Sequence, residues 1–167
     1  MALVEIEPEL NWDLVLRLRI EALNADYIHC IDDDRLEEWH KFFADGGIYR
    51  VTSRENTDLN LPVSLIYCEG RGMFQDRISA LRTANIFEPH TYCHMVSALQ
   101  IQESKGGMYR TKSNFSITRT MAEGAMLNFA CGRYLDTIVE QGGALKFQER
   151  NVILESRRID TLLVIPI

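Results

Sequence analysis

The sequence has 167 residues, of which 46% are hydrophobic and 25% are charged, and this composition is typical of one globular domain with its own core. Its net charge of −6 disfavours nucleic-acid binding, because contact with the phosphate backbone relies on clustered Lys and Arg. The four cysteines form no C-x-x-C pair, and there is neither a signal-peptide pattern nor an apolar run of about 18 residues, so we expect free thiols in a cytoplasmic protein.

The N-terminal half predicts three helices. Apolar residues recur at steps of three or four through residues 11–32, which predicts an amphipathic helix. Its buried stripe consists of Trp12, Leu16, Ile20, Leu23, Tyr27 and Ile31. Asp34 and Glu37 match a capping box and predict a second helix over residues 35–43. Helical spacing of apolar residues predicts a third helix over residues 73–86.

Two short strands separate the second and third helices. Residues 48–53 and 64–70 are rich in β-branched and aromatic residues, which favour strands. The polar residues between them, 54–62, are typical of a loop.

After Pro89 the apolar period changes to two, which is typical of antiparallel strands with one wet face. Glycines at 106–107, 124 and 142–143 predict hairpin turns. The four strands joined by these turns cover residues 91–103, 108–120, 125–140 and 144–156. Helices followed by a long meander predict an α+β fold, with three N-terminal helices packed on a curved, mostly antiparallel sheet. We expect a single domain over residues 1–167, with residues 1–10 as a flexible N-terminal segment.

The cluster His90, Cys93 and His94 is a candidate metal site. On a regular strand, however, Cys93 faces away from the two histidines, and these lie about 13 Å apart, whereas ligands of one ion lie within about 4 Å of each other. We therefore expect no metal here and a partly buried, hydrogen-bonded His94.

Other local signatures of catalysis are absent. The sequence has no nucleophile elbow, P-loop, dinucleotide-binding or zincin motif. The run Asp32 to Asp34 lacks the glycine and the closing glutamate of a calcium loop, and we interpret it as a solvated helix cap.

Five segments together resemble the β (small) subunits of aromatic-ring-hydroxylating dioxygenases. They are EALNADYIHCIDDDRLEEWHKFFADGGIYRVTSREN, DRISALRTANIFEPHTYCHMVS, YRTKSNFSITRT, GRYLDTIV and LKFQERNVILESRRIDTLLVIPI. The resemblance covers about residues 18–167. Within the family, YRVTSREN and DRISALRTANIFEPH are most similar to small subunits of enzymes that act on aromatic carboxylates, such as terephthalate dioxygenase and salicylate 5-hydroxylase.

The resemblance implies the cone-shaped fold of nuclear transport factor 2. It also implies a large α subunit that holds a Rieske iron–sulfur cluster and a mononuclear iron, in a hexamer of three α and three β subunits with a trimeric β base. The sequence itself has neither the Cys-x-His and Cys-x-x-His pairs of a Rieske site nor a recognisable two-histidine, one-carboxylate iron site. We therefore expect a non-catalytic subunit that supports assembly, with no cofactor of its own.

Two other functions remain open at this stage. The same fold hosts dehydratases and isomerases, and an enzyme of that kind would use a proton-transferring residue inside the cone. The candidates for such a pocket are Tyr49, Asp76, His94 and Tyr134. The third possibility is a free-standing ligand-binding protein. A cone filled with side chains would disfavour both alternatives, whereas an open apolar pocket with convergent polar groups would favour them.

Arg77 and Arg82 are candidates for subunit interfaces, because each could pair with a carboxylate across a subunit boundary. The apolar residues Leu162 to Ile165 would promote aggregation if they were exposed. We therefore expect the chain's own core or a neighbouring subunit to cover them.

Overall fold

The computed structural model describes residues 8–157 and 163–167, with side chains from residue 12 onward. Its helices are α1 (Pro8–Asp32), the 3₁₀ helix η1 (Leu36–Phe42), α2 (Arg54–Asp58) and α3 (Gly70–Thr83). Its strands are β1 (Phe43–Ser53), β2 (Ile66–Glu69), β3 (His90–Lys105), β4 (Met108–Met121), β5 (Met126–Gln141) and β6 (Ala144–Leu154). Among the described residues, no helix combines the length and the hydropathy needed to span a membrane.

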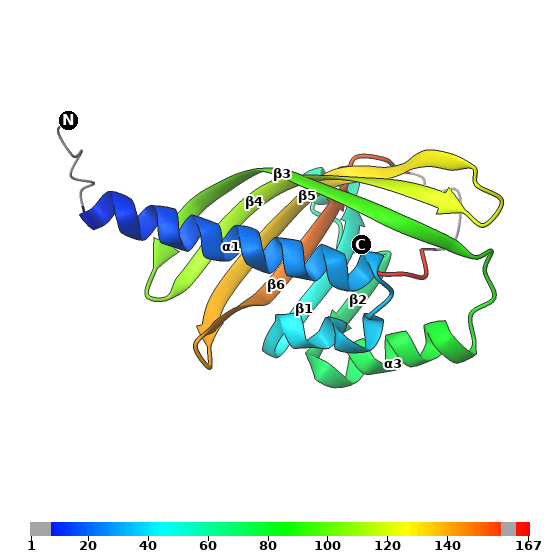
Figure 1. The fold of residues 1–167 in the computed structure, drawn as a ribbon, viewed down its shortest axis with the longest axis horizontal. Helices are drawn as coiled ribbons and strands as arrows, with labels where there is room; N and C mark the ends of the chain where they lie inside the picture. The colour runs from blue at the N-terminus through cyan, green and yellow to red at the C-terminus, as the bar shows by residue number, and fades with distance from the viewer. Residues whose placement is uncertain (1–7, 158–162) are drawn as a thin grey trace, which may run out of the picture.

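The strands form one sheet in the order β2-β1-β6-β5-β4-β3. All neighbouring strands are antiparallel except β1 and β6, which run parallel. Figure 1 shows α1 crossing the strands, α3 lying beside β1 and β2, and the last residues ending between these helices. The α+β arrangement with a mostly antiparallel, curved sheet is confirmed.

Bulges account for the curvature, because an extra residue in one strand bends it and increases its twist. The β3–β4 register shifts between Ser97 and Gln100, where Ala98 has a positive φ of 54°. Further shifts interrupt the β4–β5 and β5–β6 ladders. The sheet therefore curls around α1, and the space between them, here called the interior, contains the core.

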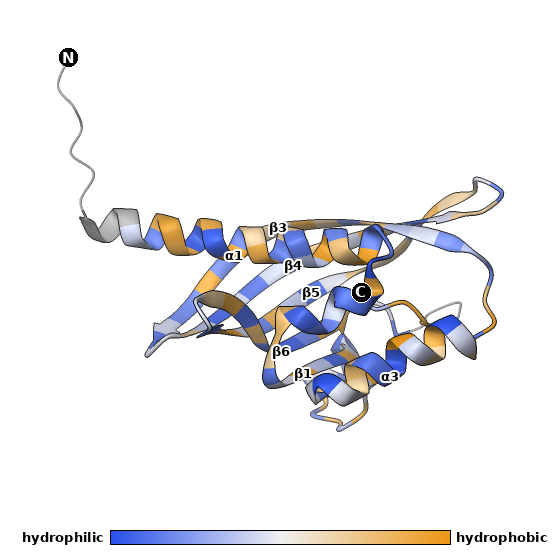
Figure 2. Cartoon of the chain, turned by 60° about the horizontal axis from the view of Figure 1, so that its bottom comes forward, coloured by the Kyte–Doolittle hydropathy of each residue, from blue (hydrophilic) through white to orange (hydrophobic). Residues whose placement is uncertain are grey.

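The core follows the predicted periodicities with one exception. On α1 the stripe from Leu16 to Ile31 is buried, as predicted, but Trp12 is 57% exposed. Figure 1 shows the first turns of α1 extending beyond the hairpin between β3 and β4. Figure 2 shows hydrophobic and hydrophilic residues alternating along α1 and α3.

Three local predictions need correction. No side chain caps η1, whose N-cap residue is Arg35, because Asp34 and Glu37 both bind Arg82 instead. The predicted loop over residues 54–62 begins with the short helix α2, whose N-cap hydroxyl, on Ser53, accepts a hydrogen bond from the Asn56 amide at 3.2 Å. Helix α3 begins and ends about three residues earlier than predicted.

The two chain ends bear on two further predictions. Residues 1–7 of the segment predicted to be flexible lie outside the described residues, whereas Pro8 is the first residue of α1. Leu162 also lies outside the described residues, but Leu163 and Val164 are buried against the chain's own core. The predicted covering of this apolar segment is confirmed for these two residues.

Candidate functional site

A buried arginine occupies the middle of the interior. Arg150, on β6, is fully buried and donates from Nε and Nη2 to the two carboxylate oxygens of Asp136 on β5, at 3.0 and 2.8 Å. Its Nη2 also donates to the side-chain oxygen of Asn24 on α1. Asp136 and Arg150 are directly opposite in the β5–β6 register, so the sheet itself aligns the pair.

Aromatic rings enclose the guanidinium of Arg150. Its central carbon lies 4.2 Å from the ring centroids of Tyr27 and Tyr134 and 3.8 Å from that of Phe147. The electron-rich faces of these rings attract a cation, most strongly where water is excluded. Burial raises the pKa of Asp136 even though Arg150 opposes the rise. The interior is therefore filled by an ion pair and aromatic side chains.

Residues 163–167 enter the interior from the side of α3. The hydroxyls of Tyr49 and Tyr27 donate to the Ile167 carbonyl oxygen at 2.8 and 3.2 Å, and the Tyr49 hydroxyl accepts from the Ile167 amide at 2.9 Å. Arg77 donates from Nη2 to the Leu163 and Val164 carbonyls at 2.9 and 3.2 Å. This segment therefore fills the end of the interior next to α3.

His94, on β3, is held by Asp32 in the last turn of α1. Its Nδ1 lies 2.6 Å from one carboxylate oxygen, and its backbone amide donates to the other at 2.8 Å. The imidazole is fully buried, and its Nε2 has no hydrogen-bond partner among the described residues. His94 is thus buried and hydrogen-bonded, and Asp32 joins α1 to β3 rather than forming a solvated cap.

The four pocket candidates do not form one site. Tyr49, His94 and Tyr134 are buried, but Asp76 is exposed on α3. Tyr49 is bonded to Ile167 and His94 to Asp32, while the Tyr134 hydroxyl has no hydrogen-bond partner among the described residues. Burial raises the pKa of Tyr49 and of Tyr134 well above the ordinary value, so both phenols stay neutral. The arrangement therefore does not bring together an acid and a base.

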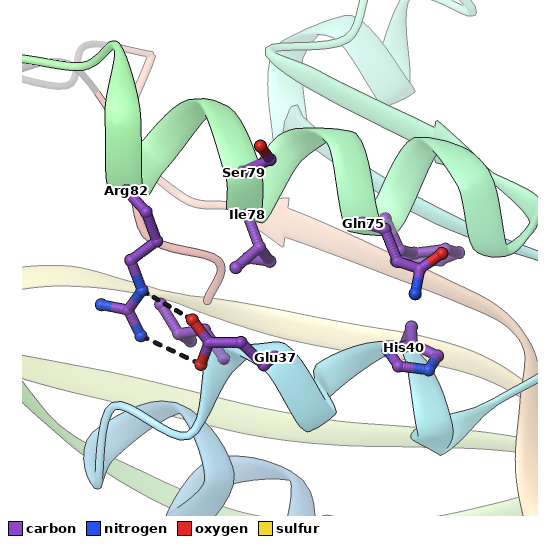
Figure 3. A pocket seen from close by; sticks show the side chains of 8 residues that line it. Glu37, His40, Gln75, Ile78, Ser79 and Arg82 are labelled. Atoms are coloured by element: carbon purple, nitrogen blue, oxygen red, sulfur yellow. Dashed lines mark hydrogen bonds and ion pairs between the residues drawn. The ribbon is translucent and has the colours of Figure 1, made fainter.

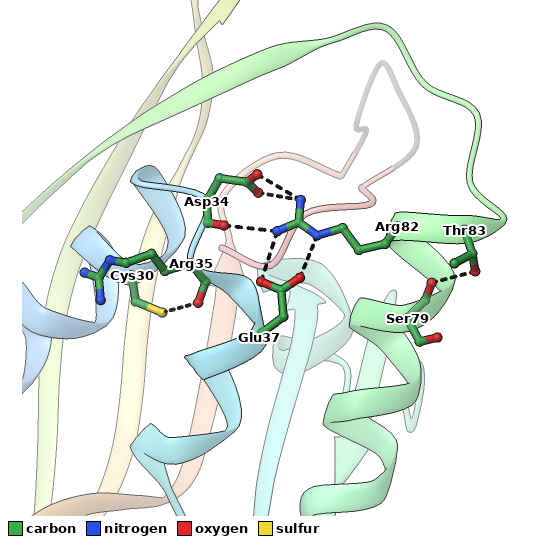
Figure 4. A network of polar contacts seen from close by, with 7 residues as sticks. All are labelled: Cys30, Asp34, Arg35, Glu37, Ser79, Arg82 and Thr83. Carbon is green, nitrogen blue, oxygen red and sulfur yellow. Dashed lines mark hydrogen bonds and ion pairs between the residues drawn. The ribbon is translucent and has the colours of Figure 1, made fainter.

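The interface candidates have partners within the chain itself. Arg82 binds the Asp34 carboxylate at 2.8 Å and the Glu37 carboxylate at 2.8 Å, as Figure 4 shows. The Glu37 hydrogen bonds, followed by those of Asp34, raise the pKa of Arg82, and Arg82 in turn lowers the pKa of Glu37. These groups are largely exposed, so solvent screening leaves them a small share of the stability. They join the end of α1 to α3.

A groove of about 220 Å³ lies between η1 and α3. Its apolar floor is made by Leu36, Phe74 and Ile78. Figure 3 shows His40 and Gln75 facing each other at one end, and the Arg82–Glu37 pair at the other. The groove is open to solvent, and the two charged residues in its lining, Arg82 and Glu37, are already paired with each other.

No group of three or more histidine, cysteine, aspartate or glutamate side chains suited to a metal occurs among the described residues. Cys93 and Cys131 are exposed, whereas Cys30 and Cys68 are buried. Burial raises the pKa of Cys30 to about 11, so that thiol stays protonated and is a poor nucleophile or ligand.

Comparison with known proteins adds independent evidence. A family model described as "Ring hydroxylating beta subunit" matches residues 28–161. The small subunit of anthranilate 1,2-dioxygenase from Burkholderia cepacia is 37% identical over 158 residues, which cover 95% of this chain and 98% of that protein. Subunit beta 2 of the terminal oxygenase component of terephthalate 1,2-dioxygenase from Comamonas sp is 36% identical over 154 residues, covering 92% of this chain and all of that one.

A solved structure agrees. The β subunit assigned to an aromatic-ring-hydroxylating dioxygenase of Novosphingobium aromaticivorans superposes with a TM-score of 0.85 at 33% identity, covering 93% of this chain and 99% of that chain. The resemblance inferred from sequence is confirmed, including the likeness to a terephthalate dioxygenase subunit.

Proposed function

The chain belongs to the family of ring-hydroxylating dioxygenase β subunits, and we propose that it supports assembly of the catalytic large subunit and carries no reacting group itself. The observation that carries this proposal is the similarity to these subunits over nearly the whole length of both chains, because it extends to the sheet and the helices alike rather than to one motif. The filled interior supports it further. An independent dehydratase, isomerase or ligand-binding protein of this fold would need a pocket where Arg150, Ile167 and the aromatic rings lie.

A β subunit implies a large α subunit as its partner. We further propose three α and three β subunits per oxygenase, with the β chains forming a trimer, as the family resemblance implies. In this arrangement the Rieske cluster and the mononuclear iron belong to the α subunit, and the complex works in the cytoplasm. The substrate class that we propose is an aromatic carboxylate, because the relatives are named for anthranilate and terephthalate.

The proposal assigns structural roles to the buried candidates Tyr49, His94 and Tyr134, and no catalytic role to the exposed Asp76. Arg77 and Arg82 act inside the chain, where Arg77 fixes residues 163–164 and Arg82 fixes the end of α1. A contact of either arginine with another subunit would be additional to these bonds.

The test is co-expression with a large subunit encoded by a neighbouring reading frame. Light scattering after gel filtration should give a mass equal to three α plus three β subunits, with iron that follows the α subunit. The complex should oxygenate an aromatic carboxylate when it is supplied with its reductase. A wild-type chain that remains alone would contradict the proposal.

His94→Ala distinguishes support from chemistry in the same complex. Loss of the buried imidazole should lower the stability of the β chain by about 1 to 3 kcal/mol, because the Asp32 carboxylate loses its partner. Turnover per assembled complex should stay unchanged. A fully assembled His94→Ala complex with turnover about a hundredfold lower, which corresponds to about 2.7 kcal/mol in the barrier, would instead assign proton transfer to the interior.

A further inference from the structure

A second pocket, of about 280 Å³, lies where η1, the start of β1, the first turn of α3 and β6 meet. Its wall carries the basic side chains of His40, Lys41, Arg71 and Lys146, and Phe43 and Phe74 form its floor. These residues come from four elements and are far apart in sequence, so no local motif reveals the pocket. It is called the basic pocket below.

The basic pocket is a positive region in a chain of net charge −6. Burial lowers the pKa of His40 most. The nearby charges of Arg71, Lys41 and Lys146 lower it further, which places all three cations close to the imidazole. With His40 neutral, three positive charges remain. Cations gathered in a recess raise the local concentration of anions.

These cations are only partly neutralised. Lys41 has a long contact of 3.4 Å with Glu38, which also binds Arg35. Lys146 donates to the Lys41 carbonyl oxygen, a neutral group. Among the described residues, no ion pair of Arg71 is found.

One carboxylate, that of Asp45, also lines the pocket. It already accepts a hydrogen bond from the Gln141 side-chain amide at 2.7 Å. The first turn of α3 contributes no acidic residue. The wall therefore keeps a net positive charge at neutral pH.

The floor selects the kind of anion. Phe43 and Phe74 are almost fully buried, with ring centroids 4.4 Å apart and planes inclined by 34°. Both rings line the pocket, and the small part of their surface that is left open there is apolar and lies beside the cations. A flat ring carrying a carboxylate satisfies both surfaces, because the ring packs on the phenylalanines while the carboxylate accepts charge-assisted hydrogen bonds.

We propose that the basic pocket binds the carboxylate of a small aromatic acid. This inference rests on the proposed substrate class of the oxygenase, which is an aromatic carboxylate. It adds a binding site on the β subunit itself, made from Arg71, Lys146 and Lys41 over Phe43 and Phe74. The site is separate from the buried interior.

The test uses the full chain with benzoate as the probe, followed by amide chemical-shift mapping in nuclear magnetic resonance spectra. Benzoate should shift amides around residues 40–46, 71–74 and 146 with saturable behaviour. Benzamide, which has the same shape without the charge, should bind at least about tenfold more weakly, as should acetate, which lacks the ring. Added salt should weaken benzoate binding.

Variants locate the site. Arg71→Gln should weaken benzoate binding about tenfold. Because Arg71 is exposed and has no ion pair within the described residues, thermal unfolding of this variant should match that of the wild type. Lys146→Gln added to it should weaken binding further. The matched control, Lys105→Gln with Arg110→Gln, removes two positive charges at the exposed β3–β4 hairpin and should bind benzoate like the wild type.

Several results would overturn the inference. One is that benzamide binds as tightly as benzoate. Another is that the control variant loses as much benzoate affinity as Arg71→Gln does. A third is that the saturable amide shifts map outside the basic pocket. Absence of benzoate binding, with Arg71→Gln weakening α–β assembly instead, would also overturn it and reassign the pocket to an acidic side chain of the partner. Failure of the proposed function is distinguishable, because there the wild-type chain fails to assemble with any large subunit, whatever benzoate does.

Discussion

Arg150 is the residue on which the polar part of the interior depends. Its charge is compensated by Asp136, by Asn24 and by three aromatic faces, all of them shielded from water. A buried ion pair often adds little net stability, but removing one partner is costly because the other charge is left buried and unpaired.

Arg150→Met should therefore lower the free energy of unfolding by about 3 to 5 kcal/mol, as measured by urea denaturation. The double variant Arg150→Met with Asp136→Leu should recover part of that loss, since it leaves no unpaired charge. Additive losses of the two single variants would show that the ion pair is not coupled.

The buried tyrosines make stability depend on alkaline pH. Burial raises the pKa of Tyr27 from the ordinary value of 10.0 to about 12. The folded chain thus holds a proton that the unfolded chain releases above pH 10. This contribution to stability is fully present below pH 10 and is lost as the pH rises through about 12, at about 1.4 kcal/mol per unit of difference in pKa.

We expect the unfolding free energy to fall between pH 10 and pH 12, measured by urea titrations at successive pH values. Tyr49 and Tyr134 should add to the fall, because burial raises their pKa in the same direction. Tyrosinate absorbance should rise together with loss of the fold. Reversible ionisation of these phenols with the circular dichroism unchanged would contradict the prediction.

At the scale of the elements, β5 and β6 approach each other closely at Gly132. A Cβ atom there would lie 2.0 Å from the Ile153 carbonyl oxygen and 3.1 Å from Cε1 of Phe115. Gly132→Ala should therefore cost about 1 to 3 kcal/mol, because backbone as well as a packed ring must move.

Gly72→Ala is the matched control for this substitution. Gly72 lies in α3, and nothing lies within 4 Å of the position that an added methyl group would take, so the change should stabilise the chain by up to about 1 kcal/mol through helix propensity. Thermal unfolding of both variants measures the contrast. A neutral Gly132→Ala would show that the β5–β6 contact can relax.

The elements differ in how far sequence predicts them. The period of two and the turn glycines locate β3 to β6 within a few residues, because both signals are local. The parallel pairing of β1 with β6 could not be predicted, since periodicity identifies a strand but not its partner. The capping box failed for a similar reason: Arg82, 45 residues away from Glu37, competes for the same carboxylate.

The side-chain contacts in the interior were harder to predict than the strands, although the sequence indicates which residues face away from it. The hairpin at Gly142–Gly143 alone would place Asp136 opposite Glu149, and the register shift between Thr137 and Ile138 places it opposite Arg150 instead, so the ion pair could not have been identified from the turn. Asp76 lies two residues from both Phe74 and Ile78, and residues two positions apart lie on opposite sides of a helix. Helical geometry therefore already directed it away from the core.

At the scale of the whole molecule, one edge of the sheet exposes an apolar ridge. Large side chains occupy every second position of a segment that turns at residues 59–60 and then leads into the edge strand β2, and they are exposed to solvent. The ridge consists of Leu59, Leu61, Val63, Leu65 and Tyr67, which are 45 to 61% exposed. Several large apolar side chains left exposed close together in sequence are typical of a contact between proteins, and we expect a subunit of the oxygenase to cover them.

Leu61→Gln with Val63→Gln tests the ridge. Both side chains are about half exposed, so the stability of the isolated chain should change by less than about 0.5 kcal/mol. Assembly of the oxygenase should weaken by about tenfold or more, as followed by gel filtration over a dilution series. Met126→Gln, a change at another exposed apolar residue, should leave assembly intact; undiminished assembly of the ridge variant would exclude the ridge from the interface.

The parallel pairing of β1 with β6 also determines when the sheet can close during synthesis. β1 ends at Ser53, and β6, which joins β1 to the meander, begins at Ala144. At translation rates of about 5 to 20 residues per second, β1 waits roughly 5 to 20 s for its neighbour. During that interval one edge of β1 exposes unpaired amides and carbonyls, which are templates for aggregation. The nascent N-terminal half is therefore exposed to misassembly until β6 emerges, and the long sequence separation slows folding of the released chain.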